Sequence, residues 1–491
     1  MHYRRLIAQN ILALLLLQAT PLLAQSAELP DLGAPDLIEY DQQTEENLGR
    51  AFTTSLHTQY SLNYDPEVVS FVRKIGHKIA SQTGNHRNFR FYVIDNDSIN
   101  AFAGPDGVIG IHTGLIQAVQ SEDELASVIA HEIAHITQRH LSRRYEYQSN
   151  QGNIASVATL LAAILIGMHD ANAGMATLMG GMGYNMEQQL KNSRLHESEA
   201  DSKGIEFLYK ANYNPYAMGR FFSRLSKAGQ NNTFALPEIL RTHPVTERRL
   251  AEAENRAQTM PPLKASEPNN SLNLIKLRLN KDNLQRESHD LFFLKPQKSA
   301  AENCYQLNLI NLNNSADNAT IKKGRQCLWQ LITDTPEQTL YTNLMMESIS
   351  KRQNKDQDQD ILKRILNFAE YQQALHPNDT SGLLRYADLL IKLDKVVLAQ
   401  QLLESSSENQ KYQYQANQKL AEIYARQNKN AEAYYFQAVA QMNIGNTKRS
   451  EYLLKKAEEE TNETNKPLRQ RIFLFSEKHA NLLKNSIKIT E

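Results

Sequence analysis

The chain has 491 residues, more than one hydrophobic core usually organises, so at least two domains are expected. Lysine plus arginine and aspartate plus glutamate both total 54, so no net field draws the chain towards nucleic acid or an anionic membrane. This balance argues against nucleic acid as a partner and leaves a local, peripheral membrane contact open.

The N-terminal segment 1–24 has the pattern of a secretory signal peptide. Arg4 and Arg5 precede an apolar run at 11–17, and Ala24 supplies a small residue for cleavage. The apolar run is too short to span a bilayer, and an uncleaved N-terminal anchor is the alternative interpretation. The predicted localisation is therefore the periplasm, reached by export.

The rest of the chain divides at a polar, proline-containing stretch. Residues 66–254 are typical of apolar helices with one strand-like interruption, whereas residues 256–270 have the composition of a linker. We therefore predict a mainly α-helical protein with a signal peptide at 1–24 and two domains, at 25–260 and 271–491.

Val108, Ile109, Gly110 and Ile111 predict a strand within the first domain. We expect this strand to offer unpaired backbone groups to an extended peptide. Such binding depends on hydrogen bonds to the main chain and tolerates many side chains. Extended, unfolded segments are therefore the expected substrates.

A helix that carries metal-ligand spacing follows this strand. Ser121 and Glu124 form a capping box, so the helix is expected to begin there. His131 and His135 are four residues apart and share a helix face, where both imidazoles can bind one Zn²⁺ per chain. Glu132 flanks the first histidine and is the candidate general base for peptide hydrolysis.

The alternative is a surface helix with two solvated histidines. Apolar neighbours such as Ile129 and Ile133 argue against it, because a polar trio within a buried helix needs partners and a metal ion supplies them.

An insertion separates this helix from the next polar helix. Residues 154–168 are apolar but too short to span a bilayer, and a stretch rich in glycine and methionine follows. We interpret the insertion as a hairpin or lid over the cleft, with simple core packing as the alternative. Its methionines are Met175, Met179, Met182 and Met186.

The third metal ligand is expected on a second helix around residue 197. Glu197 and Asp201 share a helix face, so one carboxylate can bind the metal while the other orients a ligand histidine. We assign Glu197 as ligand and Asp201 as the orienting residue. His196 and Glu199 are the rival ligands in this stretch.

Cys304 and Cys327 are the only cysteines, and both lie in the second domain. An exported chain meets an oxidising compartment, so a disulfide between them is expected. Two free buried thiols are the alternative.

The second domain shows an internal period. Ala387 and Ala421 have the same separation as Ala399 and Ala433, and this separation matches the tetratricopeptide period of about 34 residues. Further repeats are expected at 271–370 but cannot be phased there. An ordinary helical bundle is the alternative.

The motif at 131–135 followed by Glu197 and Asp201 resembles the signature of a zinc peptidase family that includes the CAAX prenyl protease and the HtpX-type proteases. The segment 242–250 is similar to that family's closing His-Pro segment, and the resemblance covers about residues 45–256. It implies a zincin-like fold, in which helices accompany a small β-sheet.

The resemblance also implies roles for two later residues. His243 lies where the family has a histidine that can occupy the open zinc position as a fourth ligand or latch, although a histidine that begins a helix would look the same. Arg249 could stabilise an oxyanion, or could pair with Glu252 on its own helix.

With the export signal and the repeats, the resemblance narrows to periplasmic members that degrade misfolded or stalled outer-membrane proteins and assist their assembly. It implies these proteins as substrates and their assembly machinery as a partner of the repeats. The alternatives are a non-proteolytic chaperone or adaptor with a latent metal site, and an integral-membrane peptidase.

Overall fold

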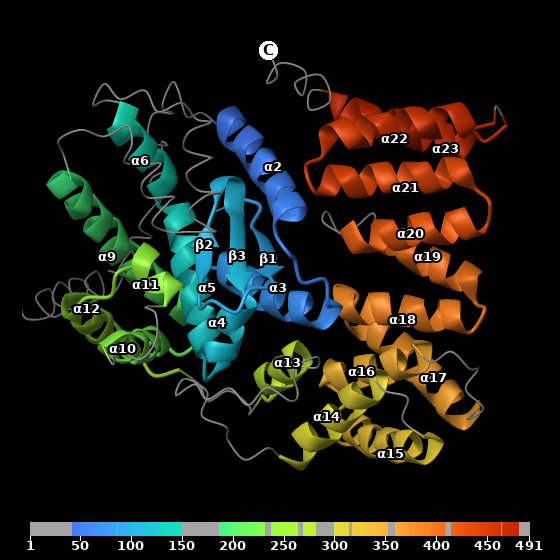
Figure 1. Ribbon diagram of the computed structural model, residues 1–491, viewed down its shortest axis with the longest axis horizontal. Coiled ribbons are helices and arrows are strands. Elements are labelled where there is room, and N and C mark those ends of the chain that lie inside the picture. The colour runs from blue at the N-terminus through green and yellow to red at the C-terminus, as the bar shows by residue number, and fades with distance from the viewer. Residues whose placement is uncertain are drawn as a thin grey trace, which may run out of the picture. The chain divides into compact units, whose positions relative to one another are not determined.

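The computed structural model describes residues 42–85, 87–149, 186–230, 237–263, 269–280, 299–313, 317–351, 359–407, 414–462 and 464–480. These residues form many helices and one three-stranded sheet, which confirms the prediction of a mainly α-helical chain (Figure 1). None of the helices described here combines the length and the apolar character needed to cross a bilayer.

The sheet is formed by β1 (Arg90–Ile94), β2 (Ala101–Ala103) and β3 (Val108–His112) in the order β1-β3-β2. β1 runs parallel to β3, and β2 runs antiparallel to it. The expectation that β3 offers a free edge is therefore wrong, because both of its sides are paired. β2 is the edge strand on the antiparallel side of the described sheet.

β1 was not anticipated from the sequence, although its aromatic and β-branched residues are typical of a strand. A short 3₁₀ helix, Pro105–Gly107, connects β2 to β3 and contains Asp106 with φ 54° and Gly107 with φ 74°. The tight left-handed turn lets β2 fold back on β3.

Helices α3 (Pro66–Ala80) and α5 (Glu122–Thr137) pack on each other and on the sheet. Their apolar residues form one buried core with the strands, in which Ile75, Ile109 and Ile129 are almost fully buried. The flanking helices are α2 (Gln42–Gln59), α4 (Thr113–Ala118) and α6 (His140–Ser149).

Helix α9 (Met186–Lys210) lies along α5 at very short range. A Cβ atom at Gly204 would lie 3.2 Å from the backbone nitrogen of His131, so a side chain there would press the two helices apart by a few tenths of an ångström. The following helices are α10 (Ala217–Gln230), α11 (Glu238–Thr242) and α12 (Glu247–Gln258).

The remainder is built from helices that pack on their sequence neighbours (Figure 1). They are α13 (Ser271–Leu279), α14 (Ala300–Asn313), α15 (Asn318–Asp334), α16 (Thr339–Ser350), α17 (Gln359–Leu375), α18 (Thr380–Lys392), α19 (Val396–Ser407), α20 (Tyr414–Arg426), α21 (Asn430–Asn443), α22 (Thr447–Glu460) and α23 (Lys466–Lys478).

The alanines that defined the repeat period occupy equivalent buried places in these helices. Ala387 and Ala399 lie in α18 and α19, Ala421 and Ala433 lie in α20 and α21, and all four belong to one apolar cluster. Small residues let paired helices approach closely, as the spacing predicted. The assignment to tetratricopeptide repeats remains a prediction.

A disulfide joins Cys304 in α14 to Cys327 in α15, with Cα atoms 6.2 Å apart, and this confirms the predicted pairing. The signal peptide at 1–24, the apolar insertion at 154–168 and the methionines Met175, Met179 and Met182 lie outside the described residues. The domain boundaries at 25–260 and 271–491 remain predictions.

Candidate metal centre

The helix that carries the HExxH motif begins where its sequence predicted. The Ser121 side chain accepts a hydrogen bond from the Glu124 backbone N–H at 3.2 Å, and Glu124 reaches back to the backbone N–H of Gln120 at 2.6 Å. Arg224 of α10 also pairs with the Glu124 carboxylate at 2.6 Å. The start of α5 is thus fixed by contacts within its own first turn and from α10.

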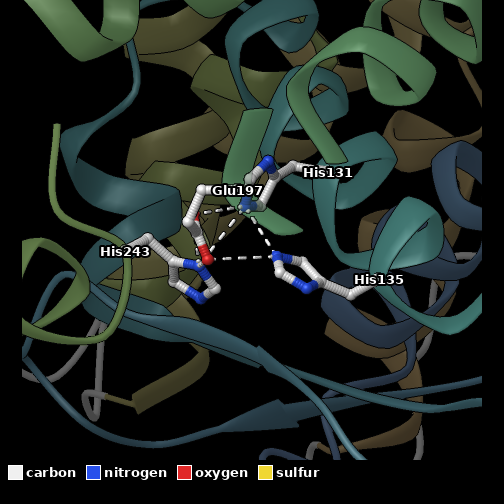
Figure 2. Close-up of side chains that lie close together, drawn as sticks. All are labelled: His131, His135, Glu197 and His243. Atoms are coloured by element: carbon white, nitrogen blue, oxygen red, sulfur yellow. Dashed lines mark hydrogen bonds and ion pairs between the residues drawn. The ribbon is translucent and has the colours of Figure 1, made fainter. Parts of the chain in front are cut away.

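Four side chains from three segments converge at one point (Figure 2). His131 and His135 project from α5, Glu197 from α9, and His243 from the link between α11 and α12. Nε2 of His131 lies 3.0 Å from Nε2 of His135, 3.4 Å from the Glu197 carboxylate and 3.3 Å from Nδ1 of His243. Nε2 of His135 lies 3.5 Å from the same carboxylate.

This donor set fits zinc. Zn²⁺ in proteins prefers imidazole nitrogen and carboxylate oxygen in a tetrahedral arrangement, and ligands about 2.1 Å from the ion then lie roughly 3.4 Å apart. The donor atoms of His131, His135, Glu197 and His243 all lie within 4.8 Å of one another, with the closest pairs near that separation.

Asp201 lies behind His131, one helix turn beyond Glu197. Its carboxylate lies 3.0 Å from Nδ1 of His131 and accepts two hydrogen bonds from Arg249, at 2.7 and 2.8 Å. Arg249 also lies 3.1 Å from Glu197 and donates to the carbonyl oxygen of Pro244 at 2.7 Å. A carboxylate in this place holds a histidine with its Nε2 free to bind a metal ion.

The electrostatics of the cluster favour a cation. Burial alone would lower the pKa of His131, but Asp201 and Glu197 raise it to about 10. Burial would raise the pKa of Glu197, yet the neighbouring histidines, His243 first, hold it well below its usual value. Burial keeps the pKa of His135 well below its usual value, so this ring retains a lone pair for a ligand.

Glu132 is almost fully buried beside the cluster, and neither of its carboxylate oxygens accepts a hydrogen bond from the described residues. Nε2 of His243 lies 3.6 Å from one of them. A buried carboxylate without hydrogen-bond donors is costly, and it is typical of a group that acts on a ligand.

His243 follows the end of α11 and does not begin a helix, since Thr246 caps α12. Its Nδ1 lies 3.0 Å from Glu197, which places it at the donor cluster. The structure therefore brings His243 where a fourth ligand would lie, while its action as a latch remains a prediction.

The two rival ligands lie elsewhere. Glu199 pairs with His140, at 3.1 Å, and with Arg143, whereas His196 stacks on the His140 ring with centroids 4.4 Å apart. Burial lowers the pKa of His140 to about 4. The sequence interpretation assigned no role to His140, and its only sequence signal is a third histidine shortly after His135.

Residues 68–257 match the model of peptidase family M48. The chain is 35% identical over 262 residues to the beta-barrel assembly-enhancing protease of Escherichia coli strain K12, which covers 53% of each protein. It is 35% identical over 264 residues to the putative beta-barrel assembly-enhancing protease of Vibrio cholerae serotype O1, covering 53% of this chain and 54% of that protein.

A more distant relative is the mitochondrial metalloendopeptidase OMA1 of Schizosaccharomyces pombe. It is 27% identical over 192 residues, covering 39% of this chain and 53% of that protein. The chain spans about half the length of the curated relatives it matches. The family match includes all four donor residues of the cluster.

Proposed function

We propose that this chain, which carries a domain of peptidase family M48 at residues 68–257, is a zinc-dependent endopeptidase. One observation carries the proposal: His131, His135, Glu197 and His243 converge within 4.8 Å beside the buried carboxylate of Glu132. Side chains of this kind, placed this close together, would supply the ligands for the ion, and Glu132 would supply the base.

His131, His135 and Glu197 would hold the zinc ion. An ion held there would supply Lewis-acid chemistry, polarising a peptide carbonyl and lowering the pKa of a water molecule. Glu132 would take the proton from the attacking water and return it to the leaving amine. Asp201 holds His131 from behind, so it acts on the reaction through that ring and not by direct proton transfer.

The edge strand β2 is the proposed docking site for an extended substrate. The carbonyl of Asn100 and the N–H of Gly104 bond to β3, so the backbone groups of Ala101 and Ala103 face the other way. β2 also packs against α5, the helix with the metal ligands. A peptide paired with β2 would therefore pass close to Glu132.

The names of the relatives suggest a setting for this activity. We propose that the chain is exported to the periplasm, degrades misfolded or stalled outer-membrane proteins, and contacts their assembly machinery through the helical repeats. The 35% identity to beta-barrel assembly-enhancing proteases supports this setting. His243 would keep the resting enzyme latent by occupying the position that the attacking water needs.

Metal analysis and cleavage of an unfolded test protein check the proposal. We expect zinc near one per chain, and loss of cleavage by about a thousandfold in Glu132→Gln with zinc retained. Glu206→Gln is the control that should cleave normally, because this partly exposed carboxylate of α9 pairs with Lys203 and Lys210 and not with the donor cluster. His243→Ala should cleave faster if His243 is a latch; unchanged or slower cleavage would remove the latch.

A non-proteolytic adaptor that acts through the repeats is the second candidate. Complementation separates the two. If Glu132→Gln fully rescues a cell that lacks the gene, the adaptor explains the function and proteolysis is incidental.

A further inference from the structure

A chain of contacts leads from His135 away from the metal cluster. Nδ1 of His135 lies 2.8 Å from Nδ1 of His140, and Nε2 of His140 lies 3.1 Å from the Glu199 carboxylate. His140 is 5% exposed and begins α6, directly after Arg139, whose left-handed backbone with φ 54° interrupts the helix between α5 and α6. Neither His140 nor Glu199 belongs to the donor cluster.

The direction of the hydrogen bonds in this chain is fixed from its outer end. An ionised carboxylate only accepts, so Nε2 of His140 must carry a proton to bond to Glu199. A neutral imidazole has one proton, so Nδ1 of His140 is left as an acceptor. The proton between the two Nδ1 atoms must then belong to His135.

We infer that His140 and Glu199 are positioning residues that hold His135 in the tautomer with a bare Nε2, the atom that faces Glu197 and His131. This inference rests on the proposed zinc site and adds the residues that prepare its second histidine. His140 and Glu199 would orient His135 in the same way that Asp201 orients His131, from 3.0 Å at Nδ1 of that ring.

Two further contacts hold His140 and Glu199 in place. Arg143 of α6 pairs with the Glu199 carboxylate, which favours its ionised form. The His196 ring stacks on His140 with an interplanar angle of 10°. Glu199 and Glu197 lie two residues apart on α9 and therefore on different faces of the helix. One face supplies the metal ligand Glu197, and the other supplies Glu199, which contacts His140.

The test changes the hydrogen bond and keeps the shape. His140→Phe fills the same space without an acceptor, whereas His140→Asn can place its amide oxygen near the position of Nδ1 and accept from His135. Glu199→Gln offers an amide that can also donate, so it no longer forces the proton onto Nε2 of His140. Glu206→Gln on the same helix is the matched control.

The readout is the dissociation constant for zinc, measured by competition with a chelator on the full chain, together with the visible spectrum of the cobalt-substituted protein. We expect zinc to bind roughly 10- to 100-fold more weakly in His140→Phe and Glu199→Gln, with an altered cobalt spectrum. His140→Asn should recover most of the affinity, and Glu206→Gln should match the native chain.

Native affinity in both His140→Phe and Glu199→Gln would overturn the inference. Equal losses in His140→Phe and His140→Asn would also overturn it, because the shape of the ring and not its acceptor would then matter. If His140→Phe does not fold, the half-exposed Glu199→Gln decides alone. If the native chain binds zinc and cleaves, and the variants bind zinc equally well, only this inference is contradicted. If the native chain binds no zinc, the proposed function is contradicted.

Discussion

Arg249 shows how the role of one residue depends on its partners. Its neighbour Arg248 pairs with Glu252 on the outer side of α12, whereas Arg249 turns inward to the carboxylates of Asp201 and Glu197. Its guanidinium is buried and engaged in several bonds before any substrate arrives. This arrangement favours support of the metal site, while the predicted oxyanion role remains untested.

Arg249→Met separates the two roles. Removal of the guanidinium leaves two buried carboxylates without their cation, so we expect the free energy of unfolding to fall by about 3 kcal/mol or more. Zinc affinity should fall as well, measured without substrate. Arg248→Met is the control and should keep nearly native stability and zinc affinity, because its ion pair is exposed. A variant with native stability and zinc affinity but a lower kcat would instead indicate the oxyanion role.

At the scale of secondary-structure elements, the pairing of the sheet could not be predicted from the strand β3 alone. The sequence predicted a strand at residues 108–111, which is observed as β3, but it did not predict that β1 would pair with the side of β3 opposite β2. The partner strand, Arg90–Ile94, lies earlier in the chain. The residues of β3 alone therefore give no information about this pairing. On the antiparallel side, the edge of the sheet in the described residues is therefore β2 and not β3.

Ala103→Pro tests β2 as the substrate edge. Proline removes an N–H that faces away from β3, so the sheet should survive while one hydrogen bond to a bound peptide is lost. We expect kcat/KM for an unfolded protein to fall about tenfold, in line with one hydrogen bond. Ala103→Thr keeps the N–H and should retain activity. Equal activity of the two variants would show that substrates bind elsewhere.

At the scale of the whole molecule, a buried ion cluster joins α3 to three helices that are distant in sequence. Arg278 of α13 lies 2.8 Å from Asp65, 3.0 Å from Glu67 and 2.8 Å from Glu347 of α16. Arg385 of α18 pairs with Glu67 at 2.8 Å. Since α3 also packs on α5, this cluster connects the C-terminal helices to the helix with the metal ligands.

The cluster predicts sensitivity to acid. Burial alone would raise the pKa of Glu347, but the guanidinium groups of Arg278 and Arg385 lower it to about 2 from its ordinary 4.5. A carboxyl whose pKa is lower in the folded chain stabilises the fold above its ordinary pKa, and this contribution is lost as the pH falls through the folded value.

Glu347→Gln should therefore lower the free energy of unfolding by about 3 kcal/mol at pH 7, and the difference from the native chain should shrink between pH 4.5 and pH 2. Urea unfolding at several pH values measures it. Glu451→Gln, which removes an exposed pair with Lys455, should cost little at any pH. A constant difference across this range would contradict the prediction.

The sequence by itself determined the local features of this protein. Four-residue spacing placed His131 and His135 on one helix face, Ser121 marked where that helix begins, and the alanine period located the helical hairpins. The resemblance drawn from the two zinc-peptidase motifs is confirmed by the family match. These features depend on contacts within one or two helix turns, which periodicity and capping report directly.

Only the tertiary structure decided how distant segments meet. It left the rival ligand Glu199 outside the donor cluster and paired it with His140. It also paired Arg249 with Asp201 and placed Arg278 among three carboxylates. Each choice depends on the distance and rotation between helices that lie far apart in the chain. Close packing at sites such as Gly204 sets that geometry, and no local propensity encodes it.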